Sequence, residues 1–228
     1  MHEASQTQVL APLLELRNVC KTYTDGNVLA LRDVSLQIHA GEFAGITGPS
    51  GCGKSTLLHM LGALDRPTSG EVLWNGNSIL DGRNLDRLRS REFGFVFQSF
   101  YLLPNLTALE NVQLPMFEGD LPLPQRVIEA KRLLNLVGLA ERMEHLPSQL
   151  SIGQRQRVAI ARALANSPAV IFADEPTGSL DSHSGREVME LLCRLNAESD
   201  TTLVVVTHDE AIAASCPRRI QMLDGAIV

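Results

Sequence analysis

The 228-residue sequence predicts an α/β fold, with a mostly parallel sheet and an inserted helical lobe. Three observations support this class. Short β-like segments precede Gln98, the pattern from there to Asn166 is helical, and after Pro168 the order becomes strand, helix, strand. The length suits one domain with a subdomain.

The part before Gln98 combines short strands with a helix after Gly53. The strands are expected over residues 14–19, 34–38, 42–47 and 70–74. In the following lobe, a helix over about residues 124–137 should end at Gly138, because a helix end often needs a left-handed residue.

Two further helix starts are expected in the helical lobe. Thr107 with Glu110 and Ser151 with Gln154 form capping-box patterns, in which a side chain and the backbone cap each other. These patterns predict helices that begin just after Thr107 and Ser151.

The segment after Pro168 has a βαβ pattern. Residues 169–173 and 203–206 are continuously apolar, which is typical of strands covered on both faces. The helix between them is expected to begin at Ser184, which has Glu187 three residues later. Strands of this kind favour a parallel sheet.

The overall composition is that of an ordinary globular protein, with 44% hydrophobic and 20% charged residues. No apolar run approaches the roughly 20 residues that cross a bilayer, and residues 1–12 lack a secretory signal, so we expect a cytoplasmic protein.

A net charge of -6 offers no general attraction for nucleic acid, which is not expected as a partner. Reduced thiols are expected, without a zinc cluster, because no CxxC pair joins Cys20, Cys52, Cys193 and Cys216.

A phosphate-binding loop is the sharpest motif, because a predicted strand precedes it and a helix follows it. It fits the pattern GxxxxGK[ST] and consists of Gly48, Pro49, Ser50, Gly51, Cys52, Gly53, Lys54, Ser55 and Thr56. Its backbone amides and the helix N-terminus would surround phosphate oxygens, with Lys54 on the β- and γ-phosphates and Ser55 on Mg²⁺. The alternative is a glycine-rich turn without a ligand. Cys52 is either a redox-sensitive exposed thiol or simply a small residue that the loop tolerates.

Two carboxylates, Asp174 and Glu175, follow the apolar strand over residues 169–173. Ligands of parallel α/β sheets bind at this edge, so we expect Asp174 to hold Mg²⁺ and Glu175 to act as a general base toward water. The alternative is a solvated strand end that binds nothing.

The segment over residues 150–157, called the signature segment below, decides among the nucleotide-hydrolysing classes. It reads LSIGQRQR and resembles the LSGGQ signature of ABC ATPases. Ser151 and Gly153, which in that family contact the γ-phosphate bound to the opposite subunit, are kept, and Gln154 is implied in the same site. Ile152 replaces the first glycine, and its bulk is expected to slow subunit closure or alter its geometry.

Other landmarks of the family occur in the same order and spacing from about residue 14 onward. Tyr23 matches the A-loop aromatic that stacks on the base, Gln98 the Q-loop, Asp181 the D-loop and His208 the switch histidine. Each residue alone also fits an ordinary surface or core position. Their joint order favours the functional interpretation.

The resemblance implies a P-loop NTPase of the ABC ATPase type, with an N-terminal antiparallel β part beside the mostly parallel sheet. A single domain would cover residues 13–228, with 99–166 as its helical signature subdomain and 1–12 as an extension.

The implied ligands are ATP and Mg²⁺. The resemblance implies catalytic roles for Lys54, Gln98, Glu175 and His208, and a metal site formed by Ser55, Gln98 and Asp174. The nucleotide would contact Tyr23, the phosphate loop and, across a dimer, Ser151, Gly153, Gln154 and Asp181.

The implied assembly is a homodimer closed around two ATP molecules that drives a separate integral membrane permease. The permease coupling helix is expected near Gln98 to Leu103, with the chain peripheral at the cytoplasmic side of the inner membrane.

Residues 173–178 and 102–112 resemble the lipoprotein-releasing and macrolide-export class. The alternative is a non-transport ABC ATPase that signals through a membrane partner, as in cell-division wall remodelling. An ABC ATPase that acts on DNA or ribosomes is disfavoured, because tandem cassettes and basic extensions are absent from the sequence. The cargo, the permease and the direction of transport stay open.

Overall fold

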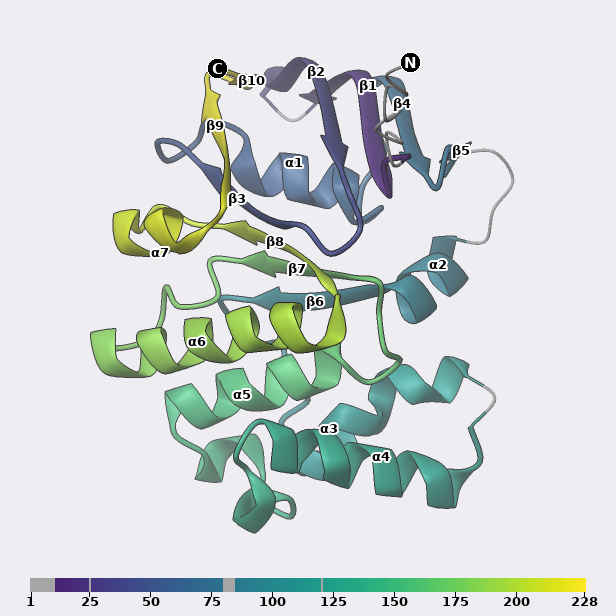
Figure 1. Cartoon of the computed structure of the whole chain (residues 1–228), viewed down its shortest axis with the longest axis vertical. Coiled ribbons are helices and arrows are strands. Elements are labelled where there is room, and N and C mark those ends of the chain that lie inside the picture. The colour runs from purple at the N-terminus through teal and green to yellow at the C-terminus, as the bar shows by residue number, and fades with distance from the viewer. Residues whose placement is uncertain (1–10, 25, 80–84, 120) are drawn as a thin grey trace, which may run out of the picture.

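The computed structural model describes residues 11–24, 26–79, 85–119 and 121–228. Two sheets and several helices form stacked layers (Figure 1). The proposed extension over residues 1–12 lies almost wholly outside the described part.

The first sheet is antiparallel and has the strand order β2-β1-β4-β5. Its strands are β1 (Leu14–Tyr23), β2 (Val28–Ile38), β4 (Ser69–Trp74) and β5 (Asn77–Ser78). It contains three of the four strands expected before Gln98, and β1 and β2 extend beyond the expected bounds.

The second sheet has the order β10-β9-β3-β8-β7-β6 and is parallel from β9 to β6. Its strands are β3 (Phe43–Thr47), β6 (Phe93–Phe97), β7 (Val170–Asp174), β8 (Thr202–Val206), β9 (Arg218–Leu223) and β10 (Ala226–Ile227). The edge strand β6 was not among the expected strands. It contains Gly94, where a Cβ would lie 2.5 Å from the carbonyl oxygen of Ala163. Close packing therefore requires glycine here, although glycine is unfavourable in the interior of a strand.

The helices separate into layers on the two faces of the parallel sheet (Figure 1). Helix α1 (Lys54–Leu61) lies between the sheets, whereas α6 (Ser182–Ser199) and α5 (Ile152–Ala163) cover the opposite face. Beyond α5 lie α3 (Ala108–Gln113) and α4 (Leu123–Leu136). The remaining helices are α2 (Leu85–Glu92), α7 (Glu210–Ser215), and the 3₁₀ helices η1 (Leu114–Glu118), η2 (Ala140–Arg142) and η3 (Pro147–Gln149).

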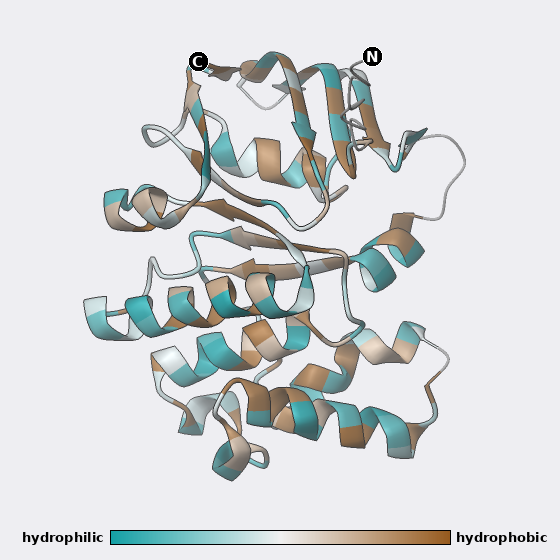
Figure 2. Ribbon diagram, viewed as in Figure 1, coloured by the Kyte–Doolittle hydropathy of each residue, from teal (hydrophilic) through white to brown (hydrophobic). Residues whose placement is uncertain are grey.

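Two hydrophobic cores lie on the two faces of the central sheet. Along β7, Val170 and Phe172 join the core with α1, whereas Ile171 and Ala173 join the core with the helical layers. Figure 2 shows hydrophobic colouring along much of these strands. This two-sided burial explains the continuously apolar runs in the sequence.

The predicted helix starts are confirmed at two of three positions. Thr107 with Glu110 and Ser151 with Gln154 form complete capping boxes. The start predicted at Ser184 is wrong, because α6 begins at Ser182 with Asp181 as its N-cap. The Asp181 carboxylate accepts hydrogen bonds from two first-turn amides, which satisfies the backbone groups that a capping box would otherwise serve.

Helix α4 ends as predicted, since Gly138 follows it with a φ of +76°. None of the helices in the described part of the chain is both long and apolar enough to cross a bilayer.

Candidate functional site

The phosphate loop connects the end of β3 to the start of α1. Gly48, Gly51 and Gly53 all have positive φ values, of 144°, 79° and 101°. A Cβ on Gly48 would lie 2.2 Å from the carbonyl oxygen of Met222, and a Cβ on Gly53 would lie 2.4 Å from that of Ala30. The loop therefore requires glycine for its backbone conformation and for its close contacts.

Lys54 and Ser55, the first two residues of α1, connect this loop to β7. Lys54 Nζ donates to the carbonyl oxygens of Gly48 and Pro49, both at 2.9 Å, so the ammonium lies over the loop. Ser55 Oγ donates to Asp174 Oδ1 at 3.1 Å. The site thus places a cation, a hydroxyl and a carboxylate beside backbone that is shaped to hold an anion.

Burial raises the pKa of Asp174, and the hydrogen bond from Ser55 is the largest of the effects that oppose it. The nearby charge of Glu175 also raises this pKa. A half-buried carboxylate in this position gains from a bound cation, and its oxygen ligands match the preference of Mg²⁺. The donor chemistry therefore fits the predicted metal.

Three further predicted residues follow the neighbouring strands β6, β7 and β8, whose carboxyl ends share one edge of the sheet (Figure 1). Glu175 Oε1 lies 2.9 Å from His208 Nδ1, in a hydrogen bond or ion pair. Gln98 approaches from β6, since a Cβ on Gly178 would lie 2.8 Å from Gln98 Nε2 and 3.3 Å from Glu175 Oε2. The sheet thus brings Gln98, Glu175 and His208 together beside Asp174.

Glu175 has a left-handed backbone conformation, with a φ of +46°. This conformation is uncommon for residues other than glycine and persists where the surrounding structure holds it. Its amide donates to the carbonyl oxygen of Val206 at 3.0 Å, and its side chain is held by His208. The carboxylate direction is therefore set by contacts from the next strand.

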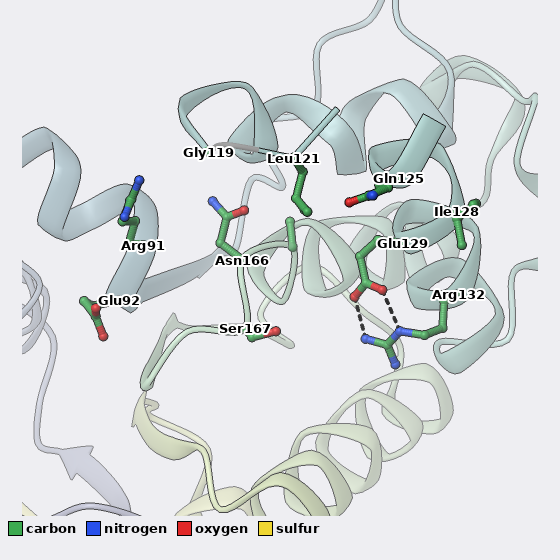
Figure 3. Close-up of a pocket in the computed structure, with 11 residues that line it drawn as sticks. Arg91, Glu92, Gly119, Leu121, Gln125, Ile128, Glu129, Arg132, Asn166 and Ser167 are labelled. Atoms are coloured by element: carbon green, nitrogen blue, oxygen red, sulfur yellow. Dashed lines mark hydrogen bonds and ion pairs between the residues drawn. The ribbon is translucent and has the colours of Figure 1, made fainter. Parts of the chain in front are cut away.

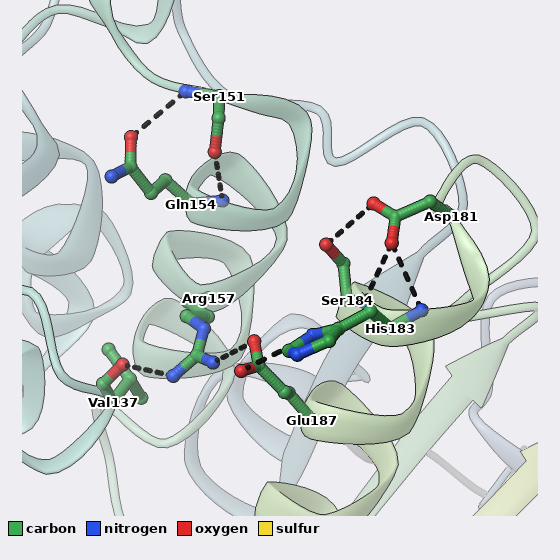
Figure 4. A network of polar contacts seen from close by, with 8 residues as sticks. All are labelled: Val137, Ser151, Gln154, Arg157, Asp181, His183, Ser184 and Glu187. Atoms are coloured by element: carbon green, nitrogen blue, oxygen red, sulfur yellow. Dashed lines mark hydrogen bonds and ion pairs between the residues drawn. The ribbon is translucent and has the colours of Figure 1, made fainter.

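The signature segment lies at the start of α5, whereas the phosphate loop precedes α1. Figure 4 shows Ser151 and Gln154 at that helix start. Ser151 and Gln154 cap the helix, and a Cβ on Gly153 would be 3.4 Å from Ser184 Oγ on α6. Ile152 is 45% exposed. Among the described residues, no hydrogen bond joins Ser151, Gly153 or Gln154 to the phosphate loop.

Asp181 and Tyr23 also lie apart from the phosphate loop. Asp181 caps α6, where the Ser184 hydroxyl donates to it at 2.7 Å and lowers its pKa (Figure 4). Tyr23 is half-buried at the end of β1, with Lys21 Nζ 4.9 Å from its ring centre. Their expected contacts with nucleotide stay predictions.

Cys52 does not present an exposed thiol. Its side chain is 4% exposed and packs in the core beneath the phosphate loop. The structure therefore favours the small-residue interpretation over the redox-sensitive one.

Arg162 is an interacting residue that the sequence analysis did not single out. It lies on α5 and donates to the carbonyl oxygens of Tyr101 and Phe100, at 2.5 and 2.6 Å. The sequence signal was a lone arginine within the otherwise apolar run over residues 158–164.

A cavity of about 790 Å³ lies elsewhere, between the end of α2 and α4 (Figure 3). Its lining includes the Glu129–Arg132 ion pair and Ile128, but none of the predicted site residues. The chemistry-bearing groups are instead gathered along the sheet edge.

A family model described as ABC transporter matches residues 31–178. The chain belongs to the ABC transporter family. It is 52% identical over 219 residues to an uncharacterized ABC transporter ATP-binding protein of Thermotoga maritima, with 94% of this chain and 93% of that protein covered. It is 50% identical to the macrolide export ATP-binding/permease protein MacB of Salmonella typhimurium, over 96% of this chain and 34% of that protein. The chain thus spans about a third of the length of this export relative.

A solved ABC structure has the same fold. It is the ATP-binding cassette MJ0796, in a dimeric post-hydrolysis state bound to ADP and Pi. The TM-score is 0.86 at 47% identity, with 94% of this chain and 96% of that chain covered. The predicted ABC ATPase fold class is confirmed, and this ABC chain is an ATP-hydrolysing transporter subunit.

Proposed function

We propose that two copies of this chain close around two ATP molecules and drive a separate membrane permease. The observation that carries the proposal is that two elements expected to contact phosphate lie on separate parts of one chain. The phosphate loop lies at the end of β3, whereas Ser151 and Gly153 lie at the start of α5, with Ser151 exposed. A second copy could place its signature segment against the phosphate that the first copy holds. The dimeric cassette bound to ADP and Pi supports this arrangement.

The residues at the sheet edge would have different roles in ATP hydrolysis. Lys54 would bind the β- and γ-phosphates, and Glu175 would take the proton of the attacking water. His208 holds the Glu175 carboxylate through the 2.9 Å contact. Stacking on Tyr23 and a D-loop contact from Asp181 would complete the nucleotide site.

A magnesium ion would be held by Ser55, Asp174 and Gln98. Mg²⁺, when bound, offsets the negative charge of the phosphate oxygens. The Ser55–Asp174 hydrogen bond already places two of these ligands side by side.

We propose that the permease docks in a groove of about 460 Å³ beside β6. The groove is lined by apolar residues such as Phe95 and Phe97 and by charged residues such as Arg89 and Arg162. Phe97 directly precedes Gln98, and Tyr101 and Leu103 nearby are 65% and 48% exposed. A permease helix in this groove would lie near the segment from Gln98 to Leu103.

The names of relatives support an export role, and a permease partner would place this chain at the cytoplasmic face of the inner membrane. MacB and the pyoverdine export protein PvdT of Pseudomonas fluorescens are both named ATP-binding/permease proteins. For this chain, a separate protein would supply the permease that in those relatives is named together with the ATP-binding part. These export names also favour transport over the alternative of a non-transport ABC ATPase that signals through a membrane partner.

The test is Mg²⁺-dependent ATP hydrolysis over a range of protein concentration, with Glu175→Gln as the variant. Turnover per subunit should rise with concentration, and the variant should lose about 10²-fold or more in rate while still binding ATP. Glu190→Gln, at an exposed position of α6, is the matched control and should keep the wild-type rate. Wild-type turnover in Glu175→Gln, or turnover independent of concentration, would contradict the proposal.

A further inference from the structure

The segment after Gln98 contains two adjacent aromatic residues in left-handed conformations. Phe100 and Tyr101 have φ values of +58° and +46°. Bulky residues rarely adopt this conformation, and it persists only where neighbouring groups enforce it. Local contacts within the segment are the bonds from Phe100 N to Phe97 O at 3.2 Å and from Tyr101 N to Ser99 O at 2.6 Å, together with an edge-to-face contact of the Phe97 and Tyr101 rings, whose centres are 5.2 Å apart. This turn, called the Phe100–Tyr101 turn below, needs a further restraint.

Arg162 on α5 supplies that restraint. Its two terminal nitrogens reach two successive carbonyl oxygens, so the planar guanidinium fixes both peptide orientations at once. Among the described residues, no carboxylate pairs with Arg162, although burial lowers its pKa. The charge of this half-buried side chain is therefore directed at two backbone carbonyls.

The same helix contacts the turn a second time, nearer its start. The guanidinium carbon of Arg155 lies 5.6 Å from the centre of the Phe100 ring. Helix α5 begins in the signature segment, so one rigid element carries both the signature residues and two contacts to the turn.

Gln98 is also restrained from its other side. Ser179 Oγ donates to the Gln98 carbonyl oxygen at 3.3 Å, and Gly178 leaves space for the Gln98 amide only because it lacks a Cβ. Gln98 is thus held at its backbone carbonyl by Ser179, its side-chain amide lies against Gly178, and the turn that Arg162 holds begins two residues later.

We propose that Arg162 is a positioning residue for hydrolysis, because it fixes the Phe100–Tyr101 turn to the signature helix and thereby sets the position of the Gln98 side chain. This inference rests on the proposed role of Gln98 at the metal site. Arg162 itself is not expected to touch nucleotide. Since it also lines the groove beside β6, an occupant of the groove would act on Gln98 through the same contact.

The first experiment compares Arg162→Met with Arg157→Met in the full chain. Arg157 is the matched control, because it lies on α5 and also donates to a backbone carbonyl, that of Val137. In the described part of the chain it forms its ion pair with Glu187 and makes no hydrogen bond or ion pair with the turn. Arg162→Met should lower kcat about tenfold and raise the Mg²⁺ concentration for half-maximal rate severalfold, with the KM for ATP within about twofold of wild type. Arg157→Met should lower Tm without changing the Mg²⁺ dependence. Arg162→Lys should recover part of the kcat, since an ammonium keeps the charge but not the fork.

A double-mutant cycle tests whether Arg162 acts through Gln98. Adding Arg162→Met to Gln98→Ala should cost little further activity, because the side chain that Arg162 positions is already absent. Multiplied losses would overturn the proposal, and so would an unchanged Mg²⁺ dependence in Arg162→Met.

Hydrogen exchange of the amides over residues 98–103 supplies a readout that does not depend on hydrolysis. Exchange there should speed up in Arg162→Met and stay unchanged in Arg157→Met. Unchanged exchange in Arg162→Met would overturn the positioning role even if the proposed function holds. If exchange speeds up in Arg162→Met but Glu175→Gln keeps wild-type turnover, the proposed function alone is contradicted.

Discussion

At the scale of single residues, burial and the nearby charge of Glu175 both raise the pKa of Asp174. Its folded-state pKa is raised, so without a cation the charged form costs stability. Asp174→Asn should therefore raise the Tm of the nucleotide-free protein by roughly 2 to 4 °C, about 1 kcal/mol, while abolishing Mg²⁺-dependent hydrolysis. Calorimetry and a hydrolysis assay check both parts.

A second carboxylate provides the contrast for that variant. Hydrogen bonds, first from the Ser184 hydroxyl, lower the pKa of Asp181, so its charged form stabilises the folded state. Asp181→Asn should not raise Tm. An equal rise in both variants would show that general reduction of negative charge, not burial of Asp174, is responsible.

The cysteines differ in burial, and this predicts their reactivity. Cys52 and Cys216 are each 4% exposed, and burial raises the pKa of Cys216 to about 11. Thiolate is the reactive form, so iodoacetamide at pH 8 should leave both unmodified in the folded protein and label both after unfolding. Mass spectrometry of the digested protein measures this. Rapid native labelling of Cys52 would restore the redox-sensitive interpretation.

At the scale of elements, the capping box at the start of α3 makes a separable contribution to stability. Thr107→Ala should destabilise the protein by about 1 kcal/mol in urea unfolding at pH 7. Hydrogen bonds from the Thr107 backbone and hydroxyl lower the pKa of Glu110. Because the pKa of Glu110 is lowered in the folded state, its interactions stabilise the protein above the unfolded-state pKa of about 4.3. This stabilisation is lost as pH falls through the folded-state pKa. The difference between Thr107→Ala and wild type should therefore shrink in acid. An equal difference at pH 7 and pH 3 would contradict the role of Glu110.

Elements with strong local signals could be predicted from the sequence, and elements set by tertiary contact could not. The capping boxes at Thr107 and Ser151 act within one helical turn, so their patterns suffice. The start of α6 was misplaced because Asp181 and Ser184 both offer capping oxygens, and only the fold selects between them. Strand β6 escaped prediction because Gly94 is required by close approach to Ala163, which sequence periodicity cannot show.

The candidate site illustrates the same division at the scale of the whole molecule. The phosphate loop and the Asp174–Glu175 pair are local patterns, whereas Gln98 and His208 gained their interpretation from motif order alone. The strand order β3-β8-β7-β6 explains why they meet, since residues that follow these strands share one edge. The Arg162 contact joins positions far apart in the sequence, and no local pattern encodes it.

Closure of two copies is the property that Ile152 is best placed to influence. Its side chain is 45% exposed at the first turn of α5, beside the backbone amides that would face the phosphate of the other copy. A β-branched side chain there restricts how closely an anion can approach, whereas glycine leaves the amides open. In a Glu175→Gln background, Ile152→Gly should therefore lower the protein concentration for half-maximal ATP-dependent dimerisation about threefold, or ~0.7 kcal/mol. Ile152→Ala should fall between the two, and analytical ultracentrifugation with ATP measures all three. Weaker dimerisation in Ile152→Gly would show instead that Ile152 contributes apolar contact to the closed dimer.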